Sequence, residues 1–286
     1  MTGTSHQANA NGTQGSTAPA ATQYLDTPSG RIAYDVTGEG PLVVMAPGMG
    51  DVRAVYRHLV PHLVAAGHRV ATMDLRGHGE SGTDWSSYTT SAVGADYVAL
   101  IRHLGGGPAT VVGQSFSPDS AVTAAAELPD DITGVVALSP WAAEPQQGAF
   151  TKWLTGRALR SPFLWGLFYA SLHKGPKPAD FKAHLRTVKS RLREAGRTEA
   201  FIAVNAPGAK DSAADRPRVQ QPALILMGAK DPDFKSPRAE AETFASTLGG
   251  PCEIVLLEGA GHYPQAEFPA ETAAALLPFL KRTTRA

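Results

Sequence analysis

The stretch Ala109-Thr110-Val111-Val112-Gly113-Gln114-Ser115-Phe116-Ser117-Pro118 carries the feature from which the fold can be argued. Its first four residues are apolar or β-branched, which is typical of a buried strand. A helical stretch, Ala121–Leu128, follows. Ser115 is therefore predicted to lie in a sharp turn between a strand and a helix. Such a turn raises the side chain above the sheet, and the helix N-terminus favours developing negative charge.

Short apolar strands alternate with helical stretches on both sides of this turn. The predicted strands are an opening hairpin, Thr22–Asp26 and Arg31–Thr37, then Leu42–Ala46, His68–Met73, Ala109–Val112, Ile132–Leu138, Ala223–Met227 and Glu253–Leu257. The predicted helices include Val52–Ala66, Thr89–Leu104, Ala121–Leu128, Glu240–Leu248 and Pro269–Lys281. Near-continuous apolar strands that alternate with helices predict an α/β fold, with a mostly parallel sheet of eight strands and helices on both faces.

The alternation is interrupted after the sixth predicted strand. Residues 144–217 contain helical stretches separated by prolines and no clear strand. We predict that they form a helical cap over the carboxyl edge of the sheet, where ligands bind in open α/β folds. Residues 22–143 and 218–286 would form the core. Residues 1–21 are mostly small or polar, which predicts a disordered tail.

Two more groups of reactive residues follow predicted strands. Asp231 and Asp233 come after the strand Ala223–Met227, and His262 lies on a glycine-rich loop after Glu253–Leu257. An acid at a strand end can orient an imidazole that takes the proton of a serine. Asp231 is the better placed acid and Asp233 is its rival. Each group also has a plainer interpretation, as a polar turn or as a surface histidine.

The loop Ala46-Pro47-Gly48-Met49-Gly50-Asp51 completes a possible acyl-transfer site. Such a site needs backbone amides directed at the oxyanion that forms during attack. We expect these amides to be those of Met49 and Phe116, since the glycines beside Met49 allow close backbone approach. An ordinary glycine turn is the alternative. The expected substrate contacts are Trp141, Gly48 and Tyr263.

The stretch Met73-Asp74-Leu75-Arg76-Gly77-His78-Gly79-Glu80-Ser81-Gly82 is similar to a D-x-R-G-x-G-x-S segment of the α/β-hydrolase family. With the order Ser, Asp, His, the chain resembles an α/β-hydrolase with a helical cap over roughly residues 30–145 and 220–280. The resemblance implies Ser115 as nucleophile, Asp231 as acid and His262 as base. It also implies a structural role for the quoted segment. Two departures are Pro47-Gly48 in place of the usual His-Gly, and Ser117 in place of glycine.

The serine at this turn indicates which of the reactions known in the α/β-hydrolase family the chain would catalyse. Relatives with aspartate there open epoxides or displace halide, whereas Ser115 favours acyl transfer through an acyl-enzyme. Aromatic residues are concentrated in the predicted cap, which favours a medium-sized, apolar acyl substrate. We therefore predict hydrolysis of an ester, lactone or thioester. The alternatives are a thioesterase, cyclase or acyltransferase that acts on carrier-bound acyl chains, and a non-catalytic ligand-binding protein. The aromatic residues concentrated in the first part of the predicted cap are Phe150, Trp153, Phe163, Trp165, Phe168 and Tyr169.

Composition limits the partners and the compartment. The chain has 26 Lys and Arg and 26 Asp and Glu, so neither nucleic acid nor a membrane is expected as a partner. A single cysteine excludes an intrachain disulfide. We recognise no metal-ligand spacing, and acyl transfer by serine needs no cofactor. No run reaches the about 18 apolar residues of a spanning helix, so a cytoplasmic protein is expected. A monomer and a homodimer remain equally compatible with the sequence.

Overall fold

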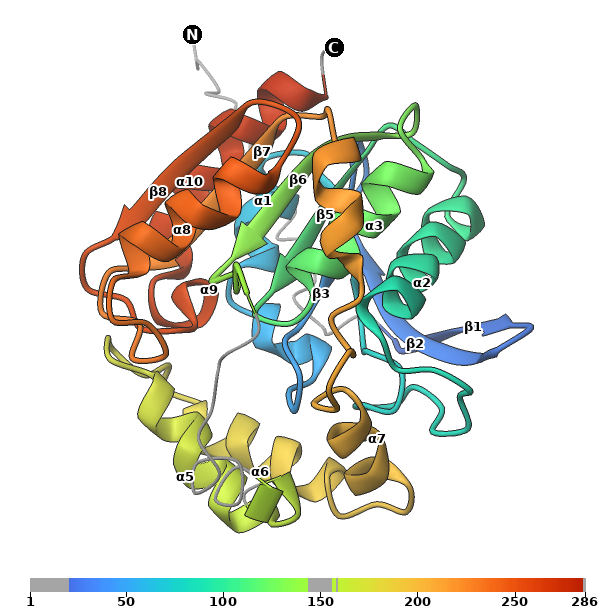
Figure 1. Ribbon diagram of the computed structural model, residues 1–286, viewed down its shortest axis with the longest axis vertical. Helices are drawn as coiled ribbons and strands as arrows, with labels where there is room; N and C mark the ends of the chain where they lie inside the picture. The colour runs from blue at the N-terminus through green and yellow to red at the C-terminus, as the bar shows by residue number, and fades with distance from the viewer. Residues whose placement is uncertain (1–20, 144–155, 158, 285–286) are drawn as a thin grey trace, which may run out of the picture.

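The computed structural model describes residues 21–143, 156–157 and 159–284 of the chain (Figure 1). All but the last residue of the predicted disordered tail, 1–21, lies outside the described residues. The first part of the predicted cap, including Phe150 and Trp153, lies outside them as well.

Eight strands form one sheet in the order β1-β2-β4-β3-β5-β6-β7-β8, and every pairing from β4 to β8 is parallel. The two opening strands pair antiparallel, β1 with β2 and β2 with β4. The predicted eight-stranded, mostly parallel sheet is therefore confirmed. The strands are β1 Gln23–Thr27, β2 Gly30–Thr37, β3 Leu42–Ala46, β4 Arg69–Met73, β5 Ala109–Gln114, β6 Ile132–Leu138, β7 Ala223–Gly228 and β8 Cys252–Leu257.

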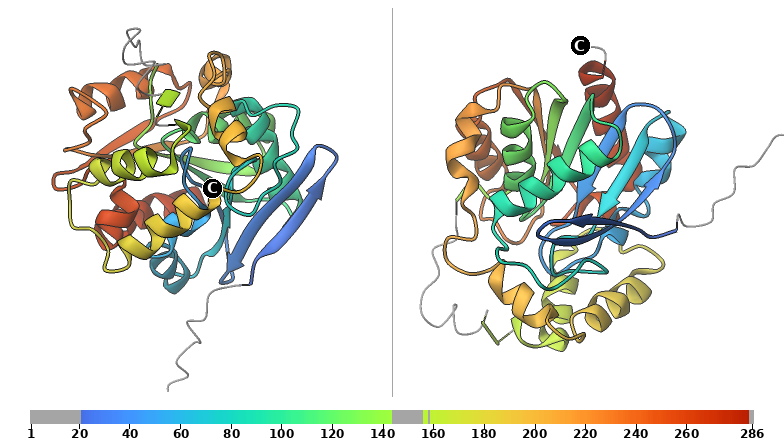
Figure 2. Two further views of the ribbon diagram at one scale, coloured as in Figure 1. Left: turned by 90° about the horizontal axis from the view of Figure 1, so that it is seen from below. Right: turned by 90° about the vertical axis from the view of Figure 1, so that its right-hand side faces the viewer.

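Helices cover both faces of the sheet (Figures 1 and 2). Residues of α2 (Thr90–His103), α3 (Pro118–Glu127) and α8 (Pro237–Thr247) contribute to one buried apolar cluster. Residues of α1 (Val60–Ala65) and α10 (Pro269–Thr283) contribute to a second cluster on the other face. This double cover explains why the central strands have almost no polar residues: each of their faces meets a helix layer.

Two local predictions differ from the structure. The predicted helix Val52–Ala66 is divided into a 3₁₀ helix, Arg53–Tyr56, and the short α1. The backbone amide of Arg53 donates instead to the buried carboxylate of Asp74, 2.7 Å away, and this distant partner is absent from the local pattern. A short helix, α9 (Pro264–Glu267), follows the His262 loop and was not predicted.

Three helices, α5 (Pro162–Leu172), α6 (Phe181–Arg191) and α7 (Arg197–Ala203), lie beyond the carboxyl ends of the strands (Figure 1). Helix α5 contacts two loops of the sheet edge. The indole Nε1 of Trp165 donates to the carbonyl of Gly50 at 2.9 Å, and the amide of His262 donates to the carbonyl of Leu172 at 3.0 Å. The helices therefore lie directly against the loops that follow β3 and β8.

A second 3₁₀ helix, Ser212–Arg218, leads back to the sheet. It packs on α3, where Arg216 pairs with Asp119 at 2.8 Å and the hydroxyl of Thr123 donates to Asp215 at 2.9 Å. The last residues of the predicted insertion therefore lie on a helix of the sheet layer. Among the described residues, no helix has the length and apolar character needed to cross a membrane.

Candidate active site

Ser115 occupies a strained turn between β5 and α3. Its φ is +57°, in the left-handed region that few non-glycine residues adopt. The amide of Ser115 donates to the carbonyl of Leu138 at 2.9 Å, which fixes the turn to the end of β6. A Cβ on Gly113 would lie 2.3 Å from the carbonyl carbon of Ser117. Only glycine therefore allows the strand and the helix to approach as closely as this turn requires.

Ser117, which replaces a glycine of the resembling family, is accommodated without strain. Its φ of −78° and ψ of −13° are ordinary helical values. Its hydroxyl donates to the carbonyl of Pro47. The two departures from the family pattern therefore contact each other, and this hydrogen bond ties the Ser115 turn to the loop after β3.

His262 and Asp231 form a buried pair at the ends of β8 and β7. His262 Nδ1 lies 2.7 Å from Asp231 Oδ2 but 3.6 Å from the nearest oxygen of Asp233. Both members of the pair are 2% exposed. Burial lowers the pKa of His262, but the charge and hydrogen bond of Asp231 outweigh burial, so the pKa is raised above its usual value. The structure therefore brings Asp231, rather than Asp233, into hydrogen-bond contact with the imidazole.

The carboxylate of Glu267, at the end of α9, organises the His262 loop. It accepts from the amides of Gly261 at 3.1 Å and Tyr263 at 3.2 Å. It also accepts from the amide of Lys174 at 2.9 Å, just after α5. A single buried carboxylate thus holds the loop on either side of His262 and joins it to the helical segment.

Gln114, the residue before Ser115, also supports this loop. Its Nε2 donates to the carbonyl of His262 at 3.2 Å. The side chain of Gln114 is fully buried. The strand that carries Ser115 is thereby linked to the backbone of His262.

The loop after β3 lies against Ser115, as an oxyanion site requires. A Cβ on Gly48 would be 3.0 Å from the Cβ of Ser115, so the loop backbone passes directly beside the serine. Within the described part of the chain, the amides of Met49 and Phe116 donate to no backbone carbonyl. Both amides are thus without a backbone acceptor among those residues, which is a requirement for binding a substrate oxygen.

Asp51 anchors this loop to the helical segment. Its carboxylate is 1% exposed and accepts from the Tyr169 hydroxyl of α5 and from His184 Nε2 of α6, each at 2.9 Å. The amide of Val52 donates to the same carboxylate at 2.8 Å. These three donors compensate the buried charge, and they connect the loop that carries Met49 to two helices.

Comparison with known proteins identifies the family. Residues 43–275 match the family described as the alpha/beta hydrolase family. The chain belongs to this family. Among curated proteins, it is similar to epoxide hydrolase A of Mycobacterium tuberculosis, at 27% identity over 90% of this chain and 96% of that protein. It is also similar to 2-(acetamidomethylene)succinate hydrolase of Mesorhizobium japonicum, at 29% identity over 88% of this chain and 92% of that protein.

Solved structures agree with this assignment. An epoxide hydrolase from an endophytic Streptomyces superposes with a TM-score of 0.73 at 27% identity, covering 92% of this chain and 96% of that one. The enol-lactonase of Burkholderia xenovorans LB400 superposes with a TM-score of 0.73 at 22% identity, covering 91% of this chain and all of the other, and supports the fold alone. The named relatives are hydrolases, and this family member is accordingly a hydrolase.

The three expected substrate contacts of the hydrolase differ in their surroundings. Gly48 borders Ser115, as described above. Trp141 is half-buried, and its ring lies 4.7 Å from that of Phe234, which in turn is 6.4 Å from the ring of His262. Tyr263 is 2% exposed and stacks on His173 at 4.6 Å. The ring of Tyr263 therefore packs between the His262 loop and α5, whereas Trp141 and Phe234 border the site.

The segment 73–82 is held in structural contacts. Asp74 is fully buried and pairs with the guanidinium of Arg53. The hydroxyl of Ser81 donates to the carbonyl of Asp74 and accepts from the amide of Ala33, both at 2.9 Å. These contacts fasten the segment to β2 and to the loop after β3.

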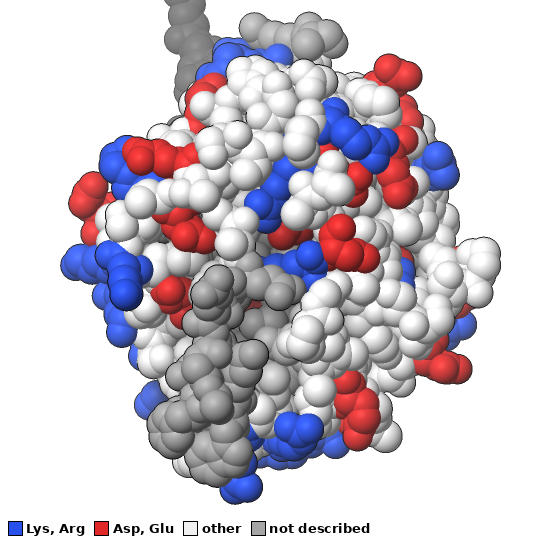
Figure 3. Space-filling view, viewed as in Figure 1, with Lys and Arg blue, Asp and Glu red and all other residues white. Residues whose placement is uncertain are grey.

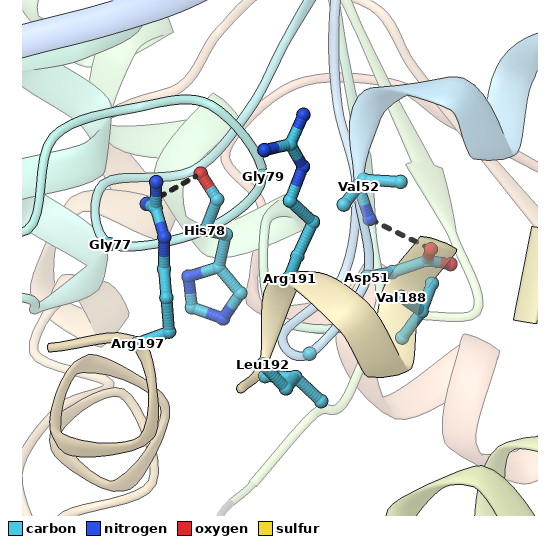
Figure 4. Close-up of a pocket in the computed structure, with 10 residues that line it drawn as sticks. Asp51, Val52, Gly77, His78, Gly79, Val188, Arg191, Leu192 and Arg197 are labelled. Atoms are coloured by element: carbon cyan, nitrogen blue, oxygen red, sulfur yellow. Dashed lines mark hydrogen bonds between the residues drawn. The ribbon is translucent and has the colours of Figure 1, made fainter. Parts of the chain in front are cut away.

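His78, from the same segment, borders a cavity of about 10 Å³ between this segment and the α6–α7 region (Figure 4). Its Nδ1 donates to the carbonyl of Arg76 at 3.0 Å. Burial lowers the pKa of His78 to about 4. The neutral imidazole is therefore a structural part of this contact, with the carbonyl of His78 accepting from Arg197.

Proposed function

We propose that this protein is a serine hydrolase that cleaves an ester-type bond, in an ester, lactone or thioester, through an acyl-enzyme on Ser115. The observation that carries the proposal is the buried contact of 2.7 Å between His262 Nδ1 and Asp231 Oδ2, at the sheet edge where the strained Ser115 turn lies. A carboxylate can only accept, so Nδ1 carries a proton, and in the neutral imidazole Nε2 is left with a lone pair. That nitrogen is the base that a serine hydroxyl needs.

The proposed reaction has two halves. The Oγ of Ser115 attacks the substrate carbonyl while His262 Nε2 takes its proton, and Asp231 stabilises the resulting imidazolium. The amides of Met49 and Phe116 donate to the oxyanion. His262 then gives the proton to the leaving alcohol or thiol, and the acyl group stays on Ser115. In the second half, His262 activates a water molecule that releases the acid and restores the serine.

The side chain at the turn argues against epoxide opening. The relatives named epoxide hydrolase share the fold and about a quarter of the sequence. Opening an epoxide through an alkyl-enzyme ester requires a carboxylate nucleophile at this turn. Ser115 would form an ether instead, which water does not readily hydrolyse. The serine therefore favours acyl transfer.

The surroundings of the proposed site favour a medium-sized, apolar acyl group. Trp141 and Phe234 provide aromatic surface beside His262, and α5–α7 would act as a cap over the site. No metal or organic cofactor enters the proposed steps. A carrier-bound acyl chain remains the second candidate, because the exposed face of α6 is basic and would suit an acidic carrier.

A fluorophosphonate probe tests the nucleophile. We expect the folded wild-type protein to be labelled and Ser115→Ala to remain unlabelled. Ser120→Ala is a matched control, since the Ser120 hydroxyl is buried on α3 without a hydrogen-bond partner among the described residues. It should label like the wild type. A folded wild-type protein that resists the probe would contradict the proposal. Rates on p-nitrophenyl esters of rising chain length, beside acyl thioesters, would then separate the two substrate classes.

A further inference from the structure

The outer face of α5 exposes four large apolar side chains. The exposed fractions are 61% for Phe163, 36% for Leu164, 57% for Leu167 and 43% for Phe168. Their spacing places them on one face of the helix. The opposite face is also apolar, and it is buried through Trp165 and other residues. Helix α5 contains no charged residue. Large apolar side chains therefore lie on both its buried face and its water-exposed face, whereas a surface helix normally exposes charged or polar residues.

A row of basic side chains lies beside this apolar face. Lys182, Arg186 and Lys189 are at positions i, i+4 and i+7 of α6, whereas Phe181, His184 and Val188 form its buried face. The two helices lie side by side when the molecule is seen from below (Figure 2, left). A Cβ on Gly166 of α5 would be 2.8 Å from the Cδ of Lys189. The stem of Lys189 therefore packs on α5.

The surrounding segment is strongly basic although the whole chain is neutral. Residues 156–193 contain nine Lys and Arg and a single acid, Asp180. Asp180 is already paired with Arg57 at 2.6 Å and with His58 at 3.0 Å. Lys and Arg side chains lie along the lower edge of the molecule, where α5 and α6 are found (Figures 1 and 3). The formal net charge of the whole chain is zero, but the surface formed by this segment is locally positive. The net charge of the chain is therefore a poor guide to the partners of this surface.

We propose that α5 and α6 form a docking face for anionic lipid surfaces. Insertion of Phe163, Leu164, Leu167 and Phe168 among the lipid chains would remove their exposed area from water, while the α6 cations would pair with lipid phosphates. With 11 residues α5 is too short to span a bilayer, so it would lie in the interface. Charge complementarity favours lipid over a second copy of this chain, because two such faces would bring like charges together.

This docking face would place a membrane next to the candidate site. The buried side of α5 contacts the loops that carry Met49 and His262, through Trp165 and Leu172. Lipid bound on the outer side would therefore be separated from those loops by the thickness of one helix. The inference does not depend on the chemistry of Ser115, and binding can be measured without turnover.

Vesicle flotation with Ser115→Ala protein tests the proposal. At low salt we expect the protein to float with vesicles of phosphatidylcholine containing 30% phosphatidylglycerol, about tenfold more than with phosphatidylcholine alone. The double variant Phe163→Ser, Leu167→Ser should lose at least tenfold in partitioning to the anionic vesicles. Lys182→Glu with Arg186→Glu should abolish the preference for them. Failure of the starting protein to float, or equal flotation of all variants, would overturn the proposal.

Matched controls separate the docking face from general surface effects. Tyr24→Ser removes an exposed apolar side chain, 48% exposed, on β1. Arg238→Glu with Lys281→Glu reverses two exposed cations on α8 and α10. Both controls should float like the starting protein. The side chains substituted in the docking-face and control variants are all exposed, so thermal melting of each variant should match that of the Ser115→Ala starting protein. A dimer that dissociates in the Phe163→Ser, Leu167→Ser variant without vesicle binding would show that a second copy covers the face, and would overturn the proposal.

Discussion

Two acids, Asp231 and Asp233, lie close to the imidazole of His262, but only one of them is within hydrogen-bond distance. Asp231 is within hydrogen-bond distance of Nδ1, whereas Asp233 is 3.6 Å away. The amide of Asp233 donates to the other oxygen of Asp231 at 3.1 Å, so Asp233 helps to orient its rival. Burial raises the pKa of Asp233 above its usual value, which the positive charge of His262 only partly opposes. Asp233 thus contributes charge near the imidazole without setting its tautomer.

We expect Asp231→Asn to reduce kcat of the hydrolase by a factor on the order of 10⁴, because an amide can donate to the imidazole and stabilise the wrong tautomer. Asp233→Asn should reduce kcat by less than about tenfold, since it removes a longer-range charge. Steady-state kinetics on the best ester of the panel measure both, with circular dichroism to verify folding. A crippled Asp233→Asn beside an active Asp231→Asn would reverse the assignment.

The candidate residues that the sequence alone could predict are those whose position along the chain carries the information. Ser115, Asp231 and His262 each follow an apolar run, and the ends of parallel strands meet at one edge. Asp51 and Glu267 had no such signal. Each is a single acid in a loop or at the end of a short helix, and its importance comes from backbone and side-chain donors far away in the chain. Hydrogen bonds between residues far apart in the chain produce no periodic pattern in the sequence, so they cannot be predicted from it.

At the scale of elements, α5 is joined to the sheet edge by polar contacts inside an apolar layer. Tyr169 is 1% exposed, and its hydroxyl donates to Asp51 while its ring packs on Tyr263 at 4.8 Å. Such an arrangement makes the loop after β3 and the helix dependent on each other. Sequence periodicity indicated helices in this segment but not which elements they pack against, because an apolar helix can pack in many different ways.

Tyr169→Phe should lower the free energy of unfolding by about 2 kcal/mol, because it keeps the ring and leaves a buried carboxylate with one donor fewer. Tyr88→Phe is the matched control. The Tyr88 hydroxyl donates to the neutral carbonyl of Thr83 in a half-buried place, so its loss should cost about 1 kcal/mol or less. Urea unfolding of the three proteins at neutral pH measures the difference. Equal stability losses in both variants would argue against a special role for the Asp51 contact.

At the scale of the whole molecule, buried neutral histidines should make the fold sensitive to acid. Burial lowers the pKa of His78 and of His173 to about 4 each, below the usual value of 6.5. The unfolded chain therefore binds protons more readily than the folded one. The stability contributed by each histidine is complete above pH 6.5 and is lost as the pH falls toward about 4, by up to about 3 kcal/mol for the fully buried His78.

His78→Asn tests this linkage, since an asparagine amide can still donate to the carbonyl of Arg76 but does not titrate. We expect the variant to lose about 3 kcal/mol less stability than the wild type between pH 7.5 and 4. Urea unfolding at several pH values provides the comparison, and His173 and the carboxylates titrate in both proteins. Parallel stability curves for the two proteins would show that the pKa of His78 is the same in the folded and unfolded states, contrary to the expectation.

The architecture of the sheet was predictable because its evidence is redundant. Strand β6 was expected at Ile132–Leu138 and occupies those residues, and most other strands differ by one or two positions. Each strand reads as an apolar run bounded by turn residues, and the opening hairpin explains the antiparallel edge. The insertion was recognisable only as an interruption of this pattern.

The hydrogen bonds that leave α5 have a consequence for protein engineering. The carbonyl of Leu172 accepts a hydrogen bond from the amide of His262. The amide of Lys174 donates to the carboxylate of Glu267, which also accepts from the amides of Gly261 and Tyr263. The helical insertion is therefore not an interchangeable module. A chimera that receives another relative's helices between β6 and β7 would inherit a new specificity only if its junction reproduced these backbone groups. Recombination between family members must therefore preserve the hydrogen bonds between the helical insertion and the loop that carries His262.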